Sequence, residues 1–138
     1  MANTNEFLGA KRSVRAVFDT ATTDSAGVSN KTIAAHGLGV FLPKGAIIVS
    51  SAYDVPTTFT SATDAATISF GVGSATDLKA ATAISTGTTY DDVAAMVAGT
   101  PVSAATAVKL SANGEVTATV AVEVLTAGKL VWYIDYVI

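Results

Sequence analysis

The chain has 138 residues, of which 50% are hydrophobic and 14% are charged, with a formal net charge of -3 and no cysteine. This length fits one domain with a core of its own, and so apolar a composition excludes a disordered chain kept in solution by its charges. The acidic balance argues against nucleic-acid binding, because phosphate contacts require clustered lysine and arginine. The lack of cysteine excludes disulfides, thiolate metal sites and cysteine nucleophiles.

Alanine and threonine dominate the composition. The sequence holds 26 alanines and 20 threonines, together one third of the chain. Buried alanine contributes little transfer free energy because its apolar area is small, so the bulky core is smaller than the hydrophobic fraction indicates. Threonine is β-branched and favours strands. The composition therefore predicts a β protein.

The first eleven residues lack any periodicity. We predict an N-terminal arm over residues 1–11 and a single β-sandwich domain over residues 12–138. Phe7 and Leu8 are the bulky apolar residues of the arm, which is either a frayed end with one local anchor or a segment that docks on a neighbouring subunit. The polar start predicts no signal peptide, and no apolar stretch is long enough for a membrane helix.

The first strand is predicted over residues 12–19, where apolar and polar side chains alternate with the period of a half-buried strand. Small polar residues over 20–30 predict a loop. A short strand is expected over 31–36, and two glycines interrupt it before apolar character returns at 40–42.

A turn signal follows at residues 43–45, where the sequence is Pro-Lys-Gly. We expect a strand over 46–55 that ends at Pro56, because proline cannot donate a ladder hydrogen bond. Residues 57–60 would add an edge piece. The clearest alternation lies at 67–72 and predicts another strand.

Residues 74–105 are predicted as a long connection with short helical turns. The segments 77–84 and 91–98 each begin with aspartate, which is favoured at helix caps and in the first turn.

The C-terminal third predicts three strands, over residues 107–111, 116–124 and 129–138. Asn113-Gly114 is a hairpin signal, since a type I′ turn needs positive φ at two positions, and residues 126–128 predict a second turn. The last strand is apolar on both faces, which indicates a central strand or one covered by a partner.

About eight strands result, with turn signals often eight to twelve residues apart. This spacing is typical of a sandwich or barrel. We predict an all-β fold, an antiparallel, jelly-roll-like β-sandwich in which the first and last strands meet.

Few side chains offer chemistry. His36 is the only histidine, so a zinc site with several histidines is excluded, and a serine triad would need His36 as its base; a structural or surface role is expected. Gly71-Val72-Gly73 resembles the start of a dinucleotide fingerprint, but position 76 is threonine where the third glycine or alanine is needed. The adjacent Asp91 and Asp92 are expected in a cap or turn, and Asp54 and Asp135 as outward charges that protect sheet edges. We predict no catalytic, metal or cofactor-binding residue.

The densest aromatic group is Trp132, Tyr133 and Tyr136. Aromatic side chains are enriched in cores and at interfaces, so we take these three as subunit-interface candidates. The alternative is a platform for binding sugars.

Five segments carry a resemblance to a known class of proteins: Leu42–Ile48, Tyr53–Val55, Ala66–Gly73, Asp77–Ala83 and Leu125–Leu130. With them the sequence, over roughly residues 11–138, resembles small structural proteins of tailed bacteriophages. These segments are fold-pattern motifs and contain no catalytic signature.

The resemblance implies a virion component made in the host cytoplasm. The expected role is a capsid decoration or cement protein that binds the major capsid protein on the outer capsid surface, often as a homotrimer. Phe7, Leu8 and Arg12 are candidates for anchoring an arm on the capsid. The alternatives are a tail, fibre or knob subunit and a carbohydrate-binding sandwich, and an enzyme is the least favoured class.

Overall fold

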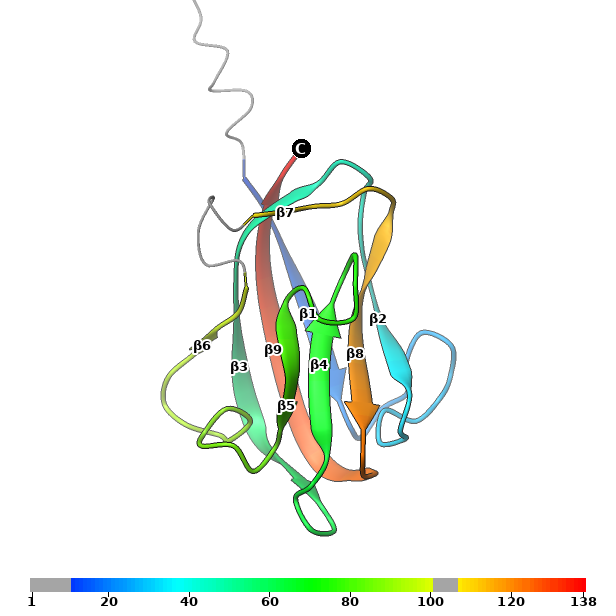
Figure 1. The fold of residues 1–138 in the computed structure, drawn as a ribbon, viewed down its shortest axis with the longest axis vertical. Helices are drawn as coiled ribbons and strands as arrows, with labels where there is room; N and C mark the ends of the chain where they lie inside the picture. The colour runs from blue at the N-terminus through cyan, green and yellow to red at the C-terminus, as the bar shows by residue number, and fades with distance from the viewer. Residues whose placement is uncertain (1–10, 101–106) are drawn as a thin grey trace, which may run out of the picture.

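Two antiparallel β-sheets lie face to face in the computed structural model, which describes residues 11–100 and 107–138 (Figure 1). One sheet contains, in spatial order, β1 (Arg12–Asp19), β9 (Leu125–Val137), β3 (Ile47–Ser61) and β6 (Val97–Ala98), with β7 (Val108–Lys109) also paired to β3. The other contains β2 (Ala35–Leu42), β8 (Gly114–Ala121), β4 (Thr67–Gly71) and β5 (Lys79–Ala83). The predicted antiparallel β-sandwich is confirmed.

The strand pairing is nested. The first strand pairs with the last and the second with the eighth, each antiparallel, which is the connectivity of a jelly roll. The predicted meeting of the terminal strands is confirmed, with Arg12 opposite Tyr136 and Asp19 opposite Lys129.

β9 is the central strand of its sheet, between β1 and β3. Its inner face is buried through Leu130, Trp132, Ile134 and Tyr136. Neighbours on both sides explain why its outer face is also fairly apolar, as predicted for a central strand.

Aromatic rings fill the space that the small alanines leave between the sheets. The ring centroid of Trp132 lies 4.8 Å from that of Tyr53 and 5.4 Å from that of Phe70. The buried hydroxyl of Tyr90 donates a hydrogen bond to the Ile68 carbonyl oxygen at 2.8 Å, and burial raises the pKa of that phenol. The core is thus thin but rich in aromatic contact.

Pro56 does not end its strand, contrary to the prediction. β3 continues to Ser61, and its register against β9 shifts between Asp54 and Thr57. The missing N–H of proline is accommodated at this irregularity.

The two glycines near residue 38 also fail to interrupt a strand. β2 starts at Ala35, later than predicted, and runs to Leu42 with a register shift between Gly37 and Phe41. Gly39 has φ +75°, a backbone conformation that glycine adopts without steric cost. The glycines thus produce a bulge in one continuous strand.

The predicted helical turns over 77–84 and 91–98 are wrong. β5 and β6 occupy these segments, and no helix occurs within the ranges the structure describes. Asp77 does accept backbone N–H bonds, as a helix cap would, but from Val72, Gly73 and Ser74 in a loop. The same carboxylate chemistry serves loops and helix ends, so the residue type could not distinguish them.

Two predicted turns in the C-terminal third are also wrong. The strand before Asn113-Gly114 pairs with β3, and the strand after it joins the other sheet, so this segment crosses between sheets and forms no hairpin. Residues 126–128 lie inside β9. The reversal between β8 and β9 instead occurs at Val122, which has φ +72°.

Candidate functional site

No cluster that would hold a metal ion occurs among residues 11–100 and 107–138, where histidine and carboxylates never gather in threes. Over the same ranges no helix is long and apolar enough to cross a membrane. Asp91 and Asp92 lie in the loop between β5 and β6, and the backbone N–H of Asp92 donates to the Thr58 hydroxyl at 2.8 Å. This loop placement agrees with a solvated turn.

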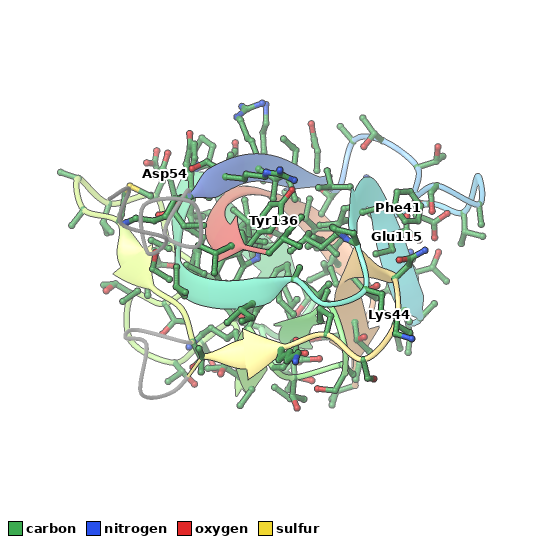
Figure 2. All side chains as sticks on the ribbon, turned by 90° about the horizontal axis from the view of Figure 1, so that it is seen from above. Phe41, Lys44, Asp54, Glu115 and Tyr136 are labelled. Atoms are coloured by element: carbon green, nitrogen blue, oxygen red, sulfur yellow. The ribbon has the colours of Figure 1, made fainter. Side chains whose placement is uncertain are left out.

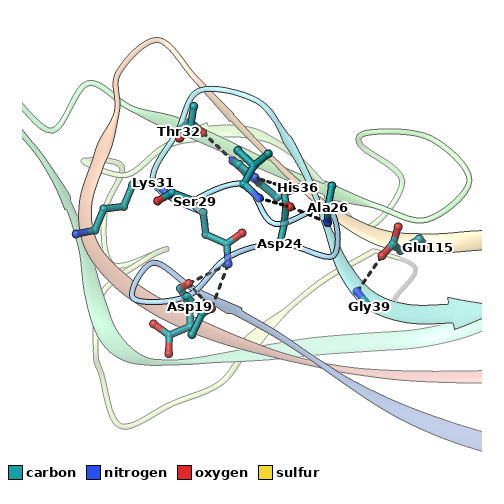
Figure 3. A network of polar contacts seen from close by, with 12 residues as sticks. Asp19, Asp24, Ala26, Ser29, Lys31, Thr32, His36, Gly39 and Glu115 are labelled. Carbon is teal, nitrogen blue, oxygen red and sulfur yellow. Dashed lines mark hydrogen bonds and ion pairs between the residues drawn. The ribbon is translucent and has the colours of Figure 1, made fainter.

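His36 is completely buried and lies beside Asp24 (Figure 3). Its Nδ1 is 2.8 Å from Oδ2 of Asp24, and its Nε2 donates to the Thr32 carbonyl oxygen at 2.7 Å. Oδ1 of Asp24 accepts the backbone N–H groups of Ala26 and Val28. The His36 hydrogen bond and then the Val28 N–H hold the pKa of Asp24 below its usual range.

Both ring nitrogens of His36 are therefore engaged. A general base needs a free nitrogen within reach of the proton it removes, and this histidine has none. His36 anchors the loop between β1 and β2, which agrees with the structural role expected from the sequence.

Two glutamates fix loops in a similar way. Oε2 of Glu115 accepts the Gly39 N–H at 2.9 Å, across the bulge of β2 (Figure 3). Glu123, at the β8–β9 turn, accepts the hydroxyl of Ser61 and the N–H groups of Thr63 and Ala65. These bonds, the one from Ser61 foremost, lower the pKa of Glu123.

The aromatic candidates separate. Trp132 and Tyr136 lie inside the sandwich at 0% and 8% exposure, whereas Tyr133 is 45% exposed on the outside. Adjacent residues of a strand point to opposite faces, so no three-residue sugar platform exists. Only Tyr133 remains on the surface as an interface candidate.

Of the arm candidates, Arg12 opens β1 and is exposed. Phe7 and Leu8 lie outside the described residues.

The outward side of the larger sheet combines charged, apolar and aromatic side chains. We call it the β9 face, and it comprises six residues: Arg15, Val17, Ala52, Asp54, Val131 and Tyr133. Each lies in a strand next to residues whose side chains point inward. Figure 2 shows Asp54 at the periphery of the molecule and Tyr136 in its interior.

Arg15 and Asp54 lie on opposite sides of β9. Arg15 is in register with Tyr133 on one side, and Asp54 is in register with Val131 on the other. The arginine and the aspartate therefore lie at diagonally opposite corners around Val131 and Tyr133, the two central outward residues of β9.

The expected edge-protecting role of Asp135 is wrong, because β9 lies between β1 and β3. For Asp54 this role stays a prediction, since the side of β3 away from β9 pairs with β6 only at Ala52 and Tyr53. Asp135 accepts the Ser50 hydroxyl at 2.9 Å and the Ser13 hydroxyl. These bonds, with Ser13 first, lower the pKa of Asp135.

The outward side of the smaller sheet is different in kind. We call it the β8 face, and seven residues form its centre: Gly37, Thr67, Ser69, Gly71, Thr117, Thr119 and Ala121. None of these seven is charged or aromatic. Glu115 of β8 and Phe41 of β2, which stand in register, lie on the same side at one end of the sheet.

Two surface features had no clear signal in the sequence. Phe41 is 63% exposed at the end of β2 although the sequence placed it in an apolar run. Val122 is 69% exposed and has positive φ, which is rare for a β-branched residue.

No protein-family profile and no curated protein matches the chain. Solved structures do. A chain in the acidic stable capsid structure of Helicobacter pylori bacteriophage KHP30 is 16% identical with a TM-score of 0.64, covering 94% of this chain and 89% of that one. A chain in the cyanophage Pam1 capsid asymmetric unit is 21% identical with a TM-score of 0.63, covering 96% and 87%. A chain in the capsid of Ralstonia phage GP4 is 21% identical with a TM-score of 0.58, covering 94% and 85%. The chain shares its fold with these phage capsid components.

Proposed function

We propose that the chain is a non-enzymatic virion protein, a capsid decoration or cement protein that binds the outer surface of the shell. The observation that carries this proposal is the fold shared with chains of three phage capsids over at least 94% of the present chain. The sequence resemblance to small structural proteins of tailed phages supports it independently of the strand arrangement.

A cement protein acts through binding alone. It contacts neighbouring subunits of the major capsid protein, and because it binds the assembled shell, it shifts the equilibrium toward that state by mass action. The described side chains fit this role, since both ring nitrogens of His36 make structural hydrogen bonds and neither is free to act as a base. Exposed residues such as Phe41 offer contact area.

The proposal includes two finer elements. The N-terminal arm anchors the chain on the shell through Phe7, Leu8 and Arg12, and the bound form is a homotrimer. The arm is supported by its two bulky apolar residues within a polar segment, and the trimer by the sequence resemblance.

Binding to empty shells tests the proposal. Phage shells assembled without this protein are mixed with the purified chain and sedimented, and we expect the chain to co-sediment and to raise the temperature at which the shells break open. A chain lacking residues 1–10 should fold but bind less. Arg12→Ala should also weaken binding, whereas Lys44→Ala, which removes an exposed cation elsewhere, should not.

Two results would contradict parts of this proposal. If the intact chain fails to bind any shell, the cement role is lost, and a virion reconstruction that places the chain in the tail would replace it with a tail or fibre role. If the truncated chain binds as well as the intact one, only the arm is removed from the proposal.

A further inference from the structure

The β9 face is the outward surface of the larger sheet. Its centre is Tyr133, which is 45% exposed, beside Val131, which its neighbours leave only 4% exposed. A half-exposed tyrosine above a closely packed apolar surface is typical of the middle of protein interfaces.

Two carboxylates on or beside this surface have hydrogen-bond partners within the chain. Asp135 accepts hydroxyl hydrogen bonds from Ser13 and Ser50. Asp19 accepts the Ala21 N–H.

Arg15 and Asp54, on the face itself, have no such partner in the described part of the chain. Within residues 11–100 and 107–138, neither side chain makes a hydrogen bond, and the one ion pair found there joins His36 to Asp24. Each lies beside apolar residues, so a partner covering the face would bury a cation and an anion that then need opposite charges. The face carries one of each.

We propose that a second copy of this chain covers the β9 face, with Arg15 of one copy against Asp54 of the next and Tyr133 at the centre of the contact. A surface that bears one cation and one anion on opposite sides of an aromatic centre is complementary to itself. A bidentate arginine–carboxylate contact also fixes orientation.

The two charges lie on opposite sides of the face, Arg15 on the β1 side and Asp54 on the β3 side. In a two-fold contact each charge of one copy meets the opposite charge of the other, and the Tyr133 rings lie together at the centre. A ring would use one Arg15–Asp54 pair in each contact and would place Tyr133 at the margin between two contacts. The inference rests on the proposed function only for the number of copies.

Charge reversal tests the contact in the purified full-length chain. Sedimentation velocity over a wide concentration range measures self-association. Arg15→Asp and Asp54→Arg each place like charges against one another, and each should raise the dissociation constant at least about tenfold. The double variant Arg15→Asp/Asp54→Arg restores opposite charges and should recover most of the affinity.

Matched controls separate this contact from a general effect of charge. Lys44→Asp and Asp92→Arg make the same changes of sign at exposed positions outside the six residues of the β9 face, and they should associate like the parent chain. Tyr133→Ser, which keeps all charges, should weaken association as well. Melting curves confirm that each variant is folded, and if Arg15→Asp does not fold, Arg15→Gln with Tyr133→Ser provides the test.

Mixing the two single variants counts the copies. In a two-fold contact, an Arg15→Asp chain and an Asp54→Arg chain satisfy both pairs, so the mixture should associate as well as the parent. In a ring of three, the two variants cannot alternate, because two copies of the same variant must be neighbours. One of the three contacts therefore keeps like charges together. Partial recovery therefore supports the trimer, whereas full recovery as a dimer keeps the β9 contact and removes the trimer.

Two outcomes would overturn the inference: a parent chain that remains monomeric at every concentration, and single reversals that associate like the Lys44 and Asp92 controls. Shell binding is measured separately, so loss of this contact leaves the cement role standing, and failure to bind shells leaves the contact standing.

Discussion

The two outer faces of the sandwich have the same secondary structure but different side chains. The β9 face presents Arg15, Asp54 and Tyr133 above a packed apolar strand. The centre of the β8 face presents only glycine, alanine, serine and threonine, and its one carboxylate, Glu115, already accepts the Gly39 N–H near the end of the sheet. Charges and an aromatic ring that can pair across a boundary favour a specific contact, so we assign the interface to the first face and solvent to the second.

Close backbone approach explains the small residues of the β8 face. A Cβ on Gly71 would overlap the carbonyl oxygen of Ser74 at 1.6 Å, because the loop held by Asp77 folds over the end of β4. Glu115 lies across Gly37 in the same way. Small side chains are therefore required where chain segments press on this face, whereas the β9 face has room for long ones.

The largest expected effect is a difference in stability between substitutions on the inner and outer sides of β9. Trp132→Ala removes a fully buried ring that contacts Tyr53 and Phe70, and it should lower the free energy of unfolding by about 3–5 kcal/mol. Tyr133→Ala, one residue away, should lower it by less than about 1 kcal/mol while weakening self-association. Urea denaturation and sedimentation of both variants measure the difference. Equal stability losses would show that the outer ring also belongs to the folded core.

The second prediction addresses the β8 face. Gly71→Ala forces the loop at Ser74 to move, and overpacking of this kind should cost about 1–3 kcal/mol of unfolding free energy. Ala52→Val, on the β9 face, adds bulk to a partly exposed position and should change stability far less. If urea midpoints show both variants equally stable, the idea that the β8 face is restricted by backbone contact is wrong.

The sequence predicted the faces of individual strands better than their partners. Alternation identified the buried side of β9 at Trp132 and Ile134, because period two is a local property. The same alternation places Trp132 and Tyr133 on opposite faces of the strand. Grouping the three aromatic residues as one cluster ignored this alternation. The inward and outward sets were therefore available from the sequence alone.

Pairing across the molecule was not available in this way. Asn113-Gly114 has the composition of a hairpin turn, yet the flanking strands join different sheets. The diagonal placement of Arg15 and Asp54 depends on the registers of β1 and β3 against β9. Registers are set by packing between distant segments, so no local pattern could have singled out this pair.

A smaller effect concerns acid. The pKa values of Asp135 on the larger sheet and of Glu123 and Asp24 in the loops are lowered by hydrogen bonds, whereas the seven central residues of the β8 face include no titratable group. A carboxylate with a lowered folded pKa stabilises the fold at pH values above its unfolded pKa of about 4, and this contribution is lost as pH falls below that value. Melting temperatures measured from neutral pH downward should therefore drop below about pH 4.

Two variants assign the acid effect. Glu123→Gln and Asp135→Asn should each be less stable than the parent at neutral pH and should lose less stability on acidification. Thr119→Asn, on the β8 face, should follow the parent curve. An acid transition that is unchanged in both carboxylate variants would mean that these hydrogen bonds do not control it.

The smallest expected effect is the sharpest test of the comparison. Thr119→Arg places a long cation in the middle of the β8 face, where Ser69 and Ala35 are its neighbours in register. An outward substitution of this kind should change the free energy of unfolding by no more than about 0.5 kcal/mol. If solvent covers this face, self-association and shell binding should both remain at the parent level, whereas Tyr133→Arg on the β9 face should abolish self-association. Loss of shell binding in Thr119→Arg would instead show that the β8 face is the side that contacts the capsid.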